Sequence, residues 1–529
     1  MKKSICLFLL IAGGLSFSGA QSARELRETY QELDVFENAL ATKLKKGIKK
    51  SDLTKIKNDK IRTVAEQLLR NEYNTEYRVA EYPAILSPTV LGEQLSIGDG
   101  YSKYENITGV YLPLGKQLVL VDGADKDKIV KLMVPNWERR APEGLDPTKD
   151  PKGWGIEKQE FDLRNGVNVV DVKNFSGLAY IAYFSDRPEN EAPIKVHFMG
   201  AAVNGYFDIK KNTDQDWNKL VDEAVYPVID AIGEHIQIAY PVEAIKKYAY
   251  GKGVELISNY DSLVYRQHRI LGLIRHNRVP KNKILSRVNY NYYMFRDGDG
   301  VAYMGAKPGY AMAMVVDPAS VIKGDPCWGF SHEVGHVHQT RPYLSWGGLG
   351  EVSNNIFSLY VTTSFGNKSR LSEQKNYEKA RQSIYGKGIS YLQDPDVFNR
   401  LVPFWQLQLY FSGKGHNPNF YPDLFEKFRQ QAAQEAGQNR RGRRGNYMER
   451  GQNPAVYQLN FVKTVCEIGK VDLTEFFDKY GFFYVGTLEY DDYGKFKYEM
   501  TEEMVVECKA AIRQMNLPKP SNDLSLLED

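Results

Sequence analysis

Apolar residues near the N-terminus follow the spacing of an amphipathic helix. Leu26, Tyr30, Leu33 and Phe36 recur every three to four residues, and a basic cluster follows at 43–50. This periodicity places one face of a helix against a core, and the charge run is typical of a solvated face. We therefore predict a small helical lead-in over residues 21–78.

The pattern changes to that of β-strands at about residue 101. Short apolar or alternating runs, separated by Gly, Asn and Pro, continue to about residue 202 and cover 109–113, 117–121, 129–134, 167–172, 178–184 and 194–199. Strands at this spacing with turn residues between them predict a β-sandwich-like accessory domain, to which we assign residues 79–206. Such a domain either recognises ligands or has a purely structural role.

Helical spacing returns after residue 207. A helical stripe runs through Trp217, Leu220, Val221, Ala224 and Val228, a β-rich patch spans 288–316, and most of 381–515 has a helical pattern. The exception is a basic, glycine-interrupted loop at 439–445, which we expect to be mobile. The sequence thus predicts an α+β multidomain protein, in which the β domain precedes a mainly helical domain (207–450), a C-terminal helical part (451–518) and a tail (519–529).

Length and composition indicate a folded protein of several domains. The 529 residues are 42% hydrophobic and 26% charged, and 69 basic against 66 acidic residues leave a net charge of +3. This balance argues against a nucleic-acid partner, which needs a strongly basic surface. Cys327, Cys466 and Cys508 have neither a disulfide framework nor metal-ligand spacing, so we expect buried free thiols.

The first 20 residues have the order of a secretory signal peptide. Two lysines follow Met1, an apolar run spans 5–15, and small residues at 18–20 precede Gln21. This order predicts cleavage after Ala20 and export to the periplasm, the surface or the surroundings of a bacterium. The run is too short for a membrane anchor, which needs roughly 20 apolar residues. No later segment has the length and apolarity of a membrane span.

The segment Ser-His-Glu-Val-Gly-His at 331–336 carries candidate metal chemistry. Histidines four residues apart on a helix lie on one face, one turn above the other. That is the arrangement that two zinc ligands require, and Glu333 lies where its carboxylate reaches the attacking water without becoming a ligand. We therefore predict His332 and His336 as metal ligands and Glu333 as the catalytic base.

A second helical pattern follows a glycine-containing loop and begins with Glu351. We predict Glu351, on the first turn of that helix, as the third ligand. The result is a His2Glu site for one zinc ion per chain with an open fourth position, which is the catalytic arrangement. Asn355 lies four residues later on the same face and is predicted to accept the other ring N–H of a ligating histidine.

These motifs resemble the enhancin-like, mucin-targeting gluzincin metallopeptidases. The family signature is His-Glu-x-Gly-His-x-x-Gln, a glycine-rich loop and Glu-Val-x-x-Asn, and the chain matches it at 332–339, 346–350 and 351–355. Weaker similarity to the family's β accessory domain lies at 108–113 and 200–217, and to its C-terminal helical part at 472–477. The resemblance implies a zincin-type (gluzincin) domain over 207–450 that hydrolyses proteins, often mucin-like O-glycoproteins.

Peptide hydrolysis needs further residues beyond the metal ligands. In this interpretation Glu333 takes a proton from the attacking water and later protonates the leaving amine, and a separate donor stabilises the oxyanion. His416 and Tyr410 are candidates for that donor by chain order alone. Trp346 and Tyr343, in the loop after the first metal helix, are candidates for lining the substrate cleft, with core packing as an equal alternative.

Two other functions remain compatible with the sequence. One is a glycan- or protein-binding surface protein with a vestigial zinc site, although the intact Glu333 argues against it. The other is a metal-dependent hydrolase that acts on a bond other than a peptide, because the ligands alone do not define the substrate. The sequence carries no signal for an oligomeric state.

Overall fold

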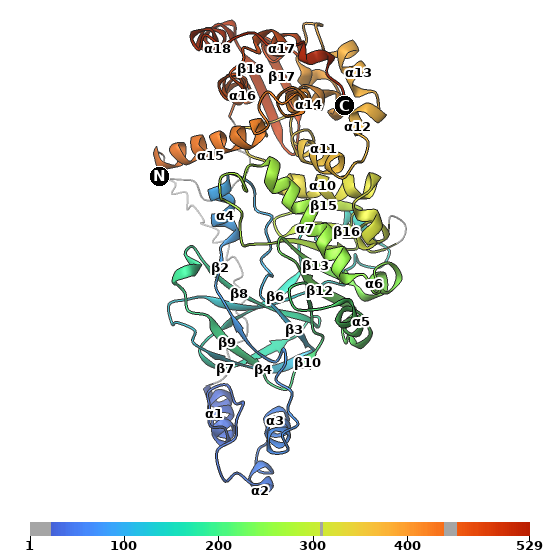
Figure 1. Ribbon diagram of the computed structural model, residues 1–529. Coiled ribbons are helices and arrows are strands. Elements are labelled where there is room, and N and C mark those ends of the chain that lie inside the picture. The colour runs from blue at the N-terminus through green and yellow to red at the C-terminus, as the bar shows by residue number, and fades with distance from the viewer. Residues whose placement is uncertain (1–22, 307–309, 439–451) are drawn as a thin grey trace, which may run out of the picture.

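The computed structural model describes residues 23–306, 310–438 and 452–529. The signal peptide predicted at 1–20 and the basic loop at 439–445 lie outside these residues. Figure 1 shows an elongated molecule with the lead-in helices at one end, two sheets next to them, then a third sheet with its helices, and the C-terminal helices at the other end. In the part of the chain that is described, no helix has the length and apolarity needed to cross a membrane.

The lead-in contains the helices α1 (Ala23–Glu32), α2 (Lys50–Leu53) and α3 (Asp59–Leu69). Helix α3 begins where the Asn58 side chain accepts hydrogen bonds from the backbone N–H groups of Lys60 and Ile61. The apolar residues of the lead-in share a small hydrophobic cluster with Leu118 and Val167 of the neighbouring sheet. The predicted helical stripe is therefore interrupted, because α1 ends at Glu32 before Phe36.

Two sheets form the region between the lead-in and residue 203. The first has the strand order β1-β9-β4-β7 and the second β10-β3-β8-β5-β6, with β2 paired to β8. The bounds are β1 Val79–Tyr82, β2 Ile85–Leu86, β3 Ile107–Leu112, β4 Gly115–Asp122, β5 Val130–Pro135, β6 Lys158–Leu163, β7 Gly166–Val172, β8 Gly177–Ser185, β9 Ile194–Phe198 and β10 Ala202–Val203; α4 (Pro88–Leu95) follows β2. Six of these strands coincide with the runs predicted from sequence. Apolar residues of both sheets lie in one hydrophobic cluster.

A third, six-stranded sheet has the order β11-β12-β13-β14-β16-β15. Its strands are β11 Phe207–Asp208, β12 Val228–Ile232, β13 Ile236–Pro241, β14 Ile284–Asn289, β15 Met294–Asp297 and β16 Gly300–Met304. The region after residue 207 is therefore less helical than predicted, and the stripe that we continued to Val228 ends with α5 (Asp214–Glu223). The physical reason is that β12 and β13 are short and buried, and periodicity alone does not separate such runs from buried helix.

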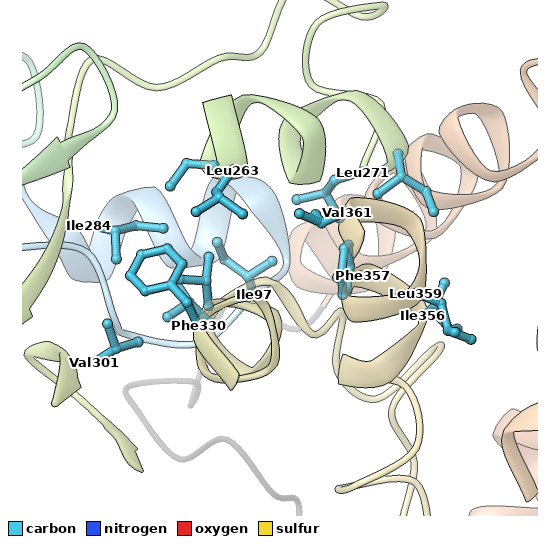
Figure 2. Packing of buried hydrophobic residues seen from close by; sticks show 14 of the residues in the cluster. Ile97, Leu263, Leu271, Ile284, Val301, Phe330, Ile356, Phe357, Leu359 and Val361 are labelled. Carbon is cyan, nitrogen blue, oxygen red and sulfur yellow. The ribbon is translucent and has the colours of Figure 1, made fainter. Parts of the chain in front are cut away.

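Helices that pack against this sheet carry the candidate site. They are α6 Val242–Tyr248, α7 Gly253–Ile270, α8 Met312–Val316, α9 Pro318–Val321, α10 Gly324–His338 and α11 Asn354–Ser364. Figure 2 shows Phe330 of α10, Phe357 of α11 and Leu263 of α7, which all belong to the central hydrophobic cluster. A Cβ atom on Gly335 would lie 2.5 Å from the backbone oxygen of Asn354, so α10 and α11 meet at backbone contact.

The C-terminal part combines helices with one hairpin. Its elements are α12 Arg370–Glu373, α13 Asn376–Ser383, α14 Val397–Gln408, α15 Phe420–Gln438, α16 Pro454–Gly469, α17 Thr474–Lys479, β17 Gly486–Asp491, β18 Lys495–Met500 and α18 Glu502–Gln514. The β17–β18 hairpin corrects the helical prediction for 381–515. Its alternation of apolar and polar residues, with Leu488 and Tyr490 on one strand and Phe496 and Tyr498 on the other, is a strand signal.

Candidate metal centre

Helix α10 places His332 and His336 one turn apart with their rings adjacent. The ring centroids are 4.8 Å apart and the rings are nearly perpendicular. Glu351 faces them from a turn that precedes α11, because the backbone N–H groups of Val352 and Ser353 both donate to Leu349 O. The prediction that Glu351 stands on the first turn of the helix is therefore wrong by three residues, since α11 begins at Asn354.

The three side chains converge at their metal-binding atoms. His332 Nε2 lies 3.1 Å from one carboxylate oxygen of Glu351, and His336 Nε2 lies 3.5 Å from the other. All three candidate ligand atoms lie within 4.8 Å of one another. The turn before α11 thus brings a carboxylate to two imidazoles that the helix presents on one face.

Two amide side chains fix the tautomers of the histidines. Asn355 Nδ2 donates to Glu351 O, so its Oδ1, 2.8 Å from His332 Nδ1, is the acceptor of the ring N–H. Gln339 Nε2 donates to Gly350 O and to the Ser353 hydroxyl, so its Oε1 accepts from His336 Nδ1 at 3.1 Å. In their neutral forms both rings therefore carry the proton on Nδ1 and direct the lone pair of Nε2 toward Glu351.

This arrangement fits a bound cation. Two Nε2 lone pairs and a carboxylate are all acceptors, and acceptors that converge at such distances repel one another unless a cation or a donor lies between them. The Asn354 amide is such a donor and lies 3.0 Å from His336 Nε2. Two imidazoles and one carboxylate with a remaining open position are the ligand set that suits catalytic zinc.

The charges of the site shift the protonation of its members. Burial alone would raise the pKa of Glu351, but the hydrogen bonds that His332 and His336 donate in their protonated forms outweigh it and lower that pKa far below its usual range. Burial would lower the pKa of His332, yet the hydrogen bond with Glu351 and the charge of Glu333 raise it. Burial raises the pKa of Glu333 above its ordinary value, with the two histidines acting in the opposite direction. Glu333 is thereby a stronger base than an exposed glutamate.

The remaining candidates from the sequence lie elsewhere. Trp346 and Tyr343 are buried: Trp346 donates its indole N–H to the Tyr391 hydroxyl, and the Tyr343 ring stacks on Phe428. Packing, rather than lining a cleft, is therefore the role that the structure gives both. Tyr410, in the π-helical turn Leu409–Gly413, stacks on His416, and its hydroxyl accepts from Ser521 N. The contacts found for the described residues do not join either of them to the metal-ligand candidates.

Two functional candidates were missed from the sequence. Gln339 belongs to the motif but received no role there. Tyr493, in the turn of the β17–β18 hairpin, donates a hydrogen bond from its hydroxyl to Glu351 Oε1, and its ring lies nearly perpendicular to that of His336. The strand alternation of 486–500 was the available signal for this hairpin, although the distance along the chain, 142 residues from Glu351, hides the contact.

An aromatic pair, the exposed Trp154 and the half-buried Tyr292, lies next to the edge strand β15. Trp154, 59% exposed, stacks on Tyr292 with ring centroids 4.0 Å apart, and Phe295 supports it edge-on. Strand β15 packs against α10, where the end of the Met294 side chain lies beside Gly329. The pair therefore adjoins the strand that packs against the helix with the metal-ligand candidates.

The helix with His-Glu-x-x-His, the following glutamate and the mixed sheet define the class of gluzincin-type metallopeptidases. Residues 200–481 match the family model of peptidase M60, enhancin and enhancin-like. The chain belongs to this family.

Solved structures share the fold. A metallopeptidase from Bacteroides thetaiotaomicron superposes with a TM-score of 0.77 at 22% identity, over 98% of this chain and 83% of that one. A metallopeptidase in complex with Tn antigen gives a TM-score of 0.72 at 23% identity, over 87% and 81%. A rat protein, TRPM8 channel-associated factor 3, is 22% identical over 339 residues. The match spans 62% of this chain but 35% of the rat protein.

Proposed function

We propose that this protein is an exported zinc-dependent endopeptidase that hydrolyses peptide bonds in proteins, with mucin-like O-glycoproteins as substrates. The observation that carries the proposal is the convergence of two Nε2 lone pairs and the Glu351 carboxylate beside a buried Glu333. Membership of a metallopeptidase family supports it. The basic, apolar and small-residue order at 1–20 supports export.

His332, His336 and Glu351 would hold the metal, and the chain's own groups would move the protons. A bound zinc ion supplies Lewis-acid polarisation of the water and the scissile carbonyl. Glu333 accepts the proton of the attacking water on its carboxylate, retains it, and releases it to the leaving amine nitrogen. Asn355 and Gln339 keep both imidazoles in the tautomer that leaves Nε2 unprotonated.

Two features support glycoproteins as the substrate class. The exposed Trp154 ring, which stacks on the half-buried Tyr292, offers a flat aromatic surface of the kind on which sugar rings stack. A metallopeptidase of the same fold forms a complex with Tn antigen. The two N-terminal sheets, with their shared hydrophobic cluster, would form the β-sandwich-like accessory domain.

The decisive test is Glu333→Gln. The amide keeps the size of the side chain but does not accept the water proton, so zinc content and substrate binding should remain while hydrolysis falls by several orders of magnitude. Glu435→Gln, at an exposed position of α15, is the matched control and should behave as wild type. Cleavage is measured on paired glycosylated and deglycosylated proteins, with zinc by elemental analysis. A wild type that binds glycans but cleaves no member of the panel would favour the binding-protein alternative.

A further inference from the structure

The β17–β18 hairpin lies against the glycine-rich loop that leads to Glu351. Asp491 pairs with Lys495 at the end of the two strands, so that residues 492–494 form the turn. The Tyr490 hydroxyl donates to Gly347 O at 2.7 Å. A Cβ atom on Gly347 would lie 2.4 Å from the Phe496 ring. The absence of side chains in the loop therefore lets the hairpin approach the metal-ligand candidates.

Asp492 holds the backbone next to Glu351. Its Oδ2 accepts hydrogen bonds from Gly348 N at 2.7 Å and Gly350 N at 2.9 Å. A Cβ atom on Gly350 would lie 2.3 Å from the other carboxylate oxygen, so the fit requires glycine there. The carboxylate thus fixes the hairpin turn and the loop in one relative position.

Tyr493 occupies the turn in a conformation that its residue type disfavours. Its φ is 55°, in the left-handed region, where an aromatic side chain is sterically unfavourable and glycine is the usual residue. The residue is nevertheless 67% exposed, so burial of its ring does not account for this conformation. Strained backbone of this kind occurs at functional sites. Here it directs the hydroxyl to Glu351 and brings the ring next to that of His336.

We propose that Tyr493 is a catalytic residue that donates a hydrogen bond to the oxyanion of the scissile carbonyl, and that Asp492 is its positioning residue. The inference rests on the proposed peptidase function. As water adds, its oxygen forms a bond to the carbonyl carbon, the π electron pair moves to the carbonyl oxygen, and the water proton goes to Glu333. Tyr493 keeps its proton. When the electron pair on the oxyanion forms the carbonyl double bond again, the C–N bond breaks. Its electron pair stays on the amine nitrogen, which takes the proton from Glu333.

Three properties of this hydroxyl suit the role. A phenol with an ordinary pKa of about 10 is a donor throughout the neutral range. It already donates to a negatively charged oxygen, at the carboxylate that would share the metal with the substrate. It is carried by a turn that Asp492 fixes, and fixed donors stabilise a developing charge without the cost of reorganisation.

The test is Tyr493→Phe, which removes the hydroxyl and keeps the ring. Tyr250→Phe is the matched control, because Tyr250 is 45% exposed and its hydroxyl also donates to a carboxylate, that of Asp222 at 2.6 Å. On an O-glycosylated peptide that the wild type cleaves, we expect Tyr493→Phe to lower kcat about 10²–10³-fold, with little change in KM and full zinc content. The affinity for a phosphinic analogue of that peptide, which imitates the oxyanion, should fall in proportion to kcat/KM. Tyr250→Phe should match the wild type.

The alternative is that Tyr493 has a purely structural role, in which its hydroxyl only holds Glu351 in position as a metal ligand. It would appear as weakened zinc affinity in the Phe variant, with kcat restored by added zinc, and that result overturns the proposal. An unchanged kcat in an active enzyme also overturns it and leaves the peptidase function intact. A wild type that binds zinc yet cleaves no peptide overturns both. Asp492→Ala provides the second variant and should lower kcat with KM and zinc content retained.

Discussion

At the residue scale, the site depends on partners that set the direction of each ligand. The spacing of His332, Glu333 and His336 predicts their roles because helix geometry alone places them. Gln339 lies three residues beyond His336 and acts through a bond across the loop to Gly350 O, which no spacing rule describes. Tyr493 reaches the site only through a tertiary contact. The sequence therefore predicts the functional residues that share one helix better than the residues, such as Gln339 and Tyr493, that contact them across a loop or from a distant segment.

Removal of the Gln339 amide should weaken metal binding. Gln339→Leu has a similar size but does not accept from His336 Nδ1 or donate to Gly350 O. We expect the zinc affinity to fall about 10–100-fold, the range found for loss of such partners, while the fold is retained. Competition with a chromophoric chelator measures this, with the exposed Gln382→Leu on α13 as the control. Equal affinities of both variants would exclude Gln339 as the residue that orients His336.

A buried carboxyl far from the metal-ligand candidates should give stability a pH dependence. Burial raises the pKa of Asp230 to about 7, although the hydrogen bond from Tyr180 opposes the shift. The folded state thus holds this proton up to about pH 7, whereas the unfolded chain releases it near pH 4. The unfolded chain therefore binds fewer protons between these values, and the contribution of Asp230 to stability falls as the pH rises from 4 to 7.

The variant Asp230→Asn carries no such titration. Its stability relative to the wild type should increase steadily between pH 5 and pH 7 and then stay constant, by a few kcal/mol at most. Other titrating groups occur in both proteins and cancel in the difference. Urea unfolding midpoints at several pH values measure it. A difference that does not change with pH would show that Asp230 titrates alike in the folded and unfolded chains.

At the scale of elements, the crossing of α10 and α11 decides whether the site forms. Helical periodicity predicts both helices, and the motif shows that the residue before His336 is glycine. It does not show why. The structure supplies the reason, since the Asn354 backbone oxygen occupies the space of a side chain at Gly335. The same close contact brings Asn354 and Asn355 to the two histidines.

Substitution by alanine should lower the stability of the protein at one glycine of α10 but not at another. Gly335→Ala forces the helices apart, because backbone cannot move away as a side chain can. We expect a loss of about 1–3 kcal/mol, with weakened zinc binding. In Gly329→Ala the new methyl group meets the flexible end of Met294 at 3.2 Å. This variant should be neutral, or more stable by up to about 1 kcal/mol through helix propensity. Thermal melting with and without zinc compares them, and similar melting temperatures would contradict the packing argument.

At the scale of the whole molecule, the predicted boundary at 206/207 crosses a continuous core. Residues of both regions share the largest hydrophobic cluster. The Tyr101 hydroxyl lies 3.1 Å from ring nitrogens of both His268 and His338, and Tyr180 bonds Asp230. Changes in the spacing of apolar and polar residues along the sequence locate the sheets and helices. This spacing contains no information on which side chains from distant segments are in contact. The lead-in differs, because its apolar residues belong to a separate cluster.

Truncation should therefore separate the two boundaries. A fragment of residues 79–529 exposes Leu118 and Val167 and leaves His197 without Tyr73 and Leu40 as partners. These residues do not belong to the core that carries the metal-ligand candidates, so the fragment should still fold, bind zinc and keep its catalytic activity. A fragment of residues 207–529 retains every metal-ligand candidate but leaves His268 and Asp230 without their hydrogen-bond partners Tyr101 and Tyr180, and unpaired buried polar groups cost about 1–3 kcal/mol each. Because the exposed apolar surface adds to this cost, we expect the shorter fragment to aggregate or to fail to bind zinc. Circular dichroism and zinc titration of both fragments test this, and a folded, zinc-binding 207–529 fragment would show that the shared core is dispensable for the site.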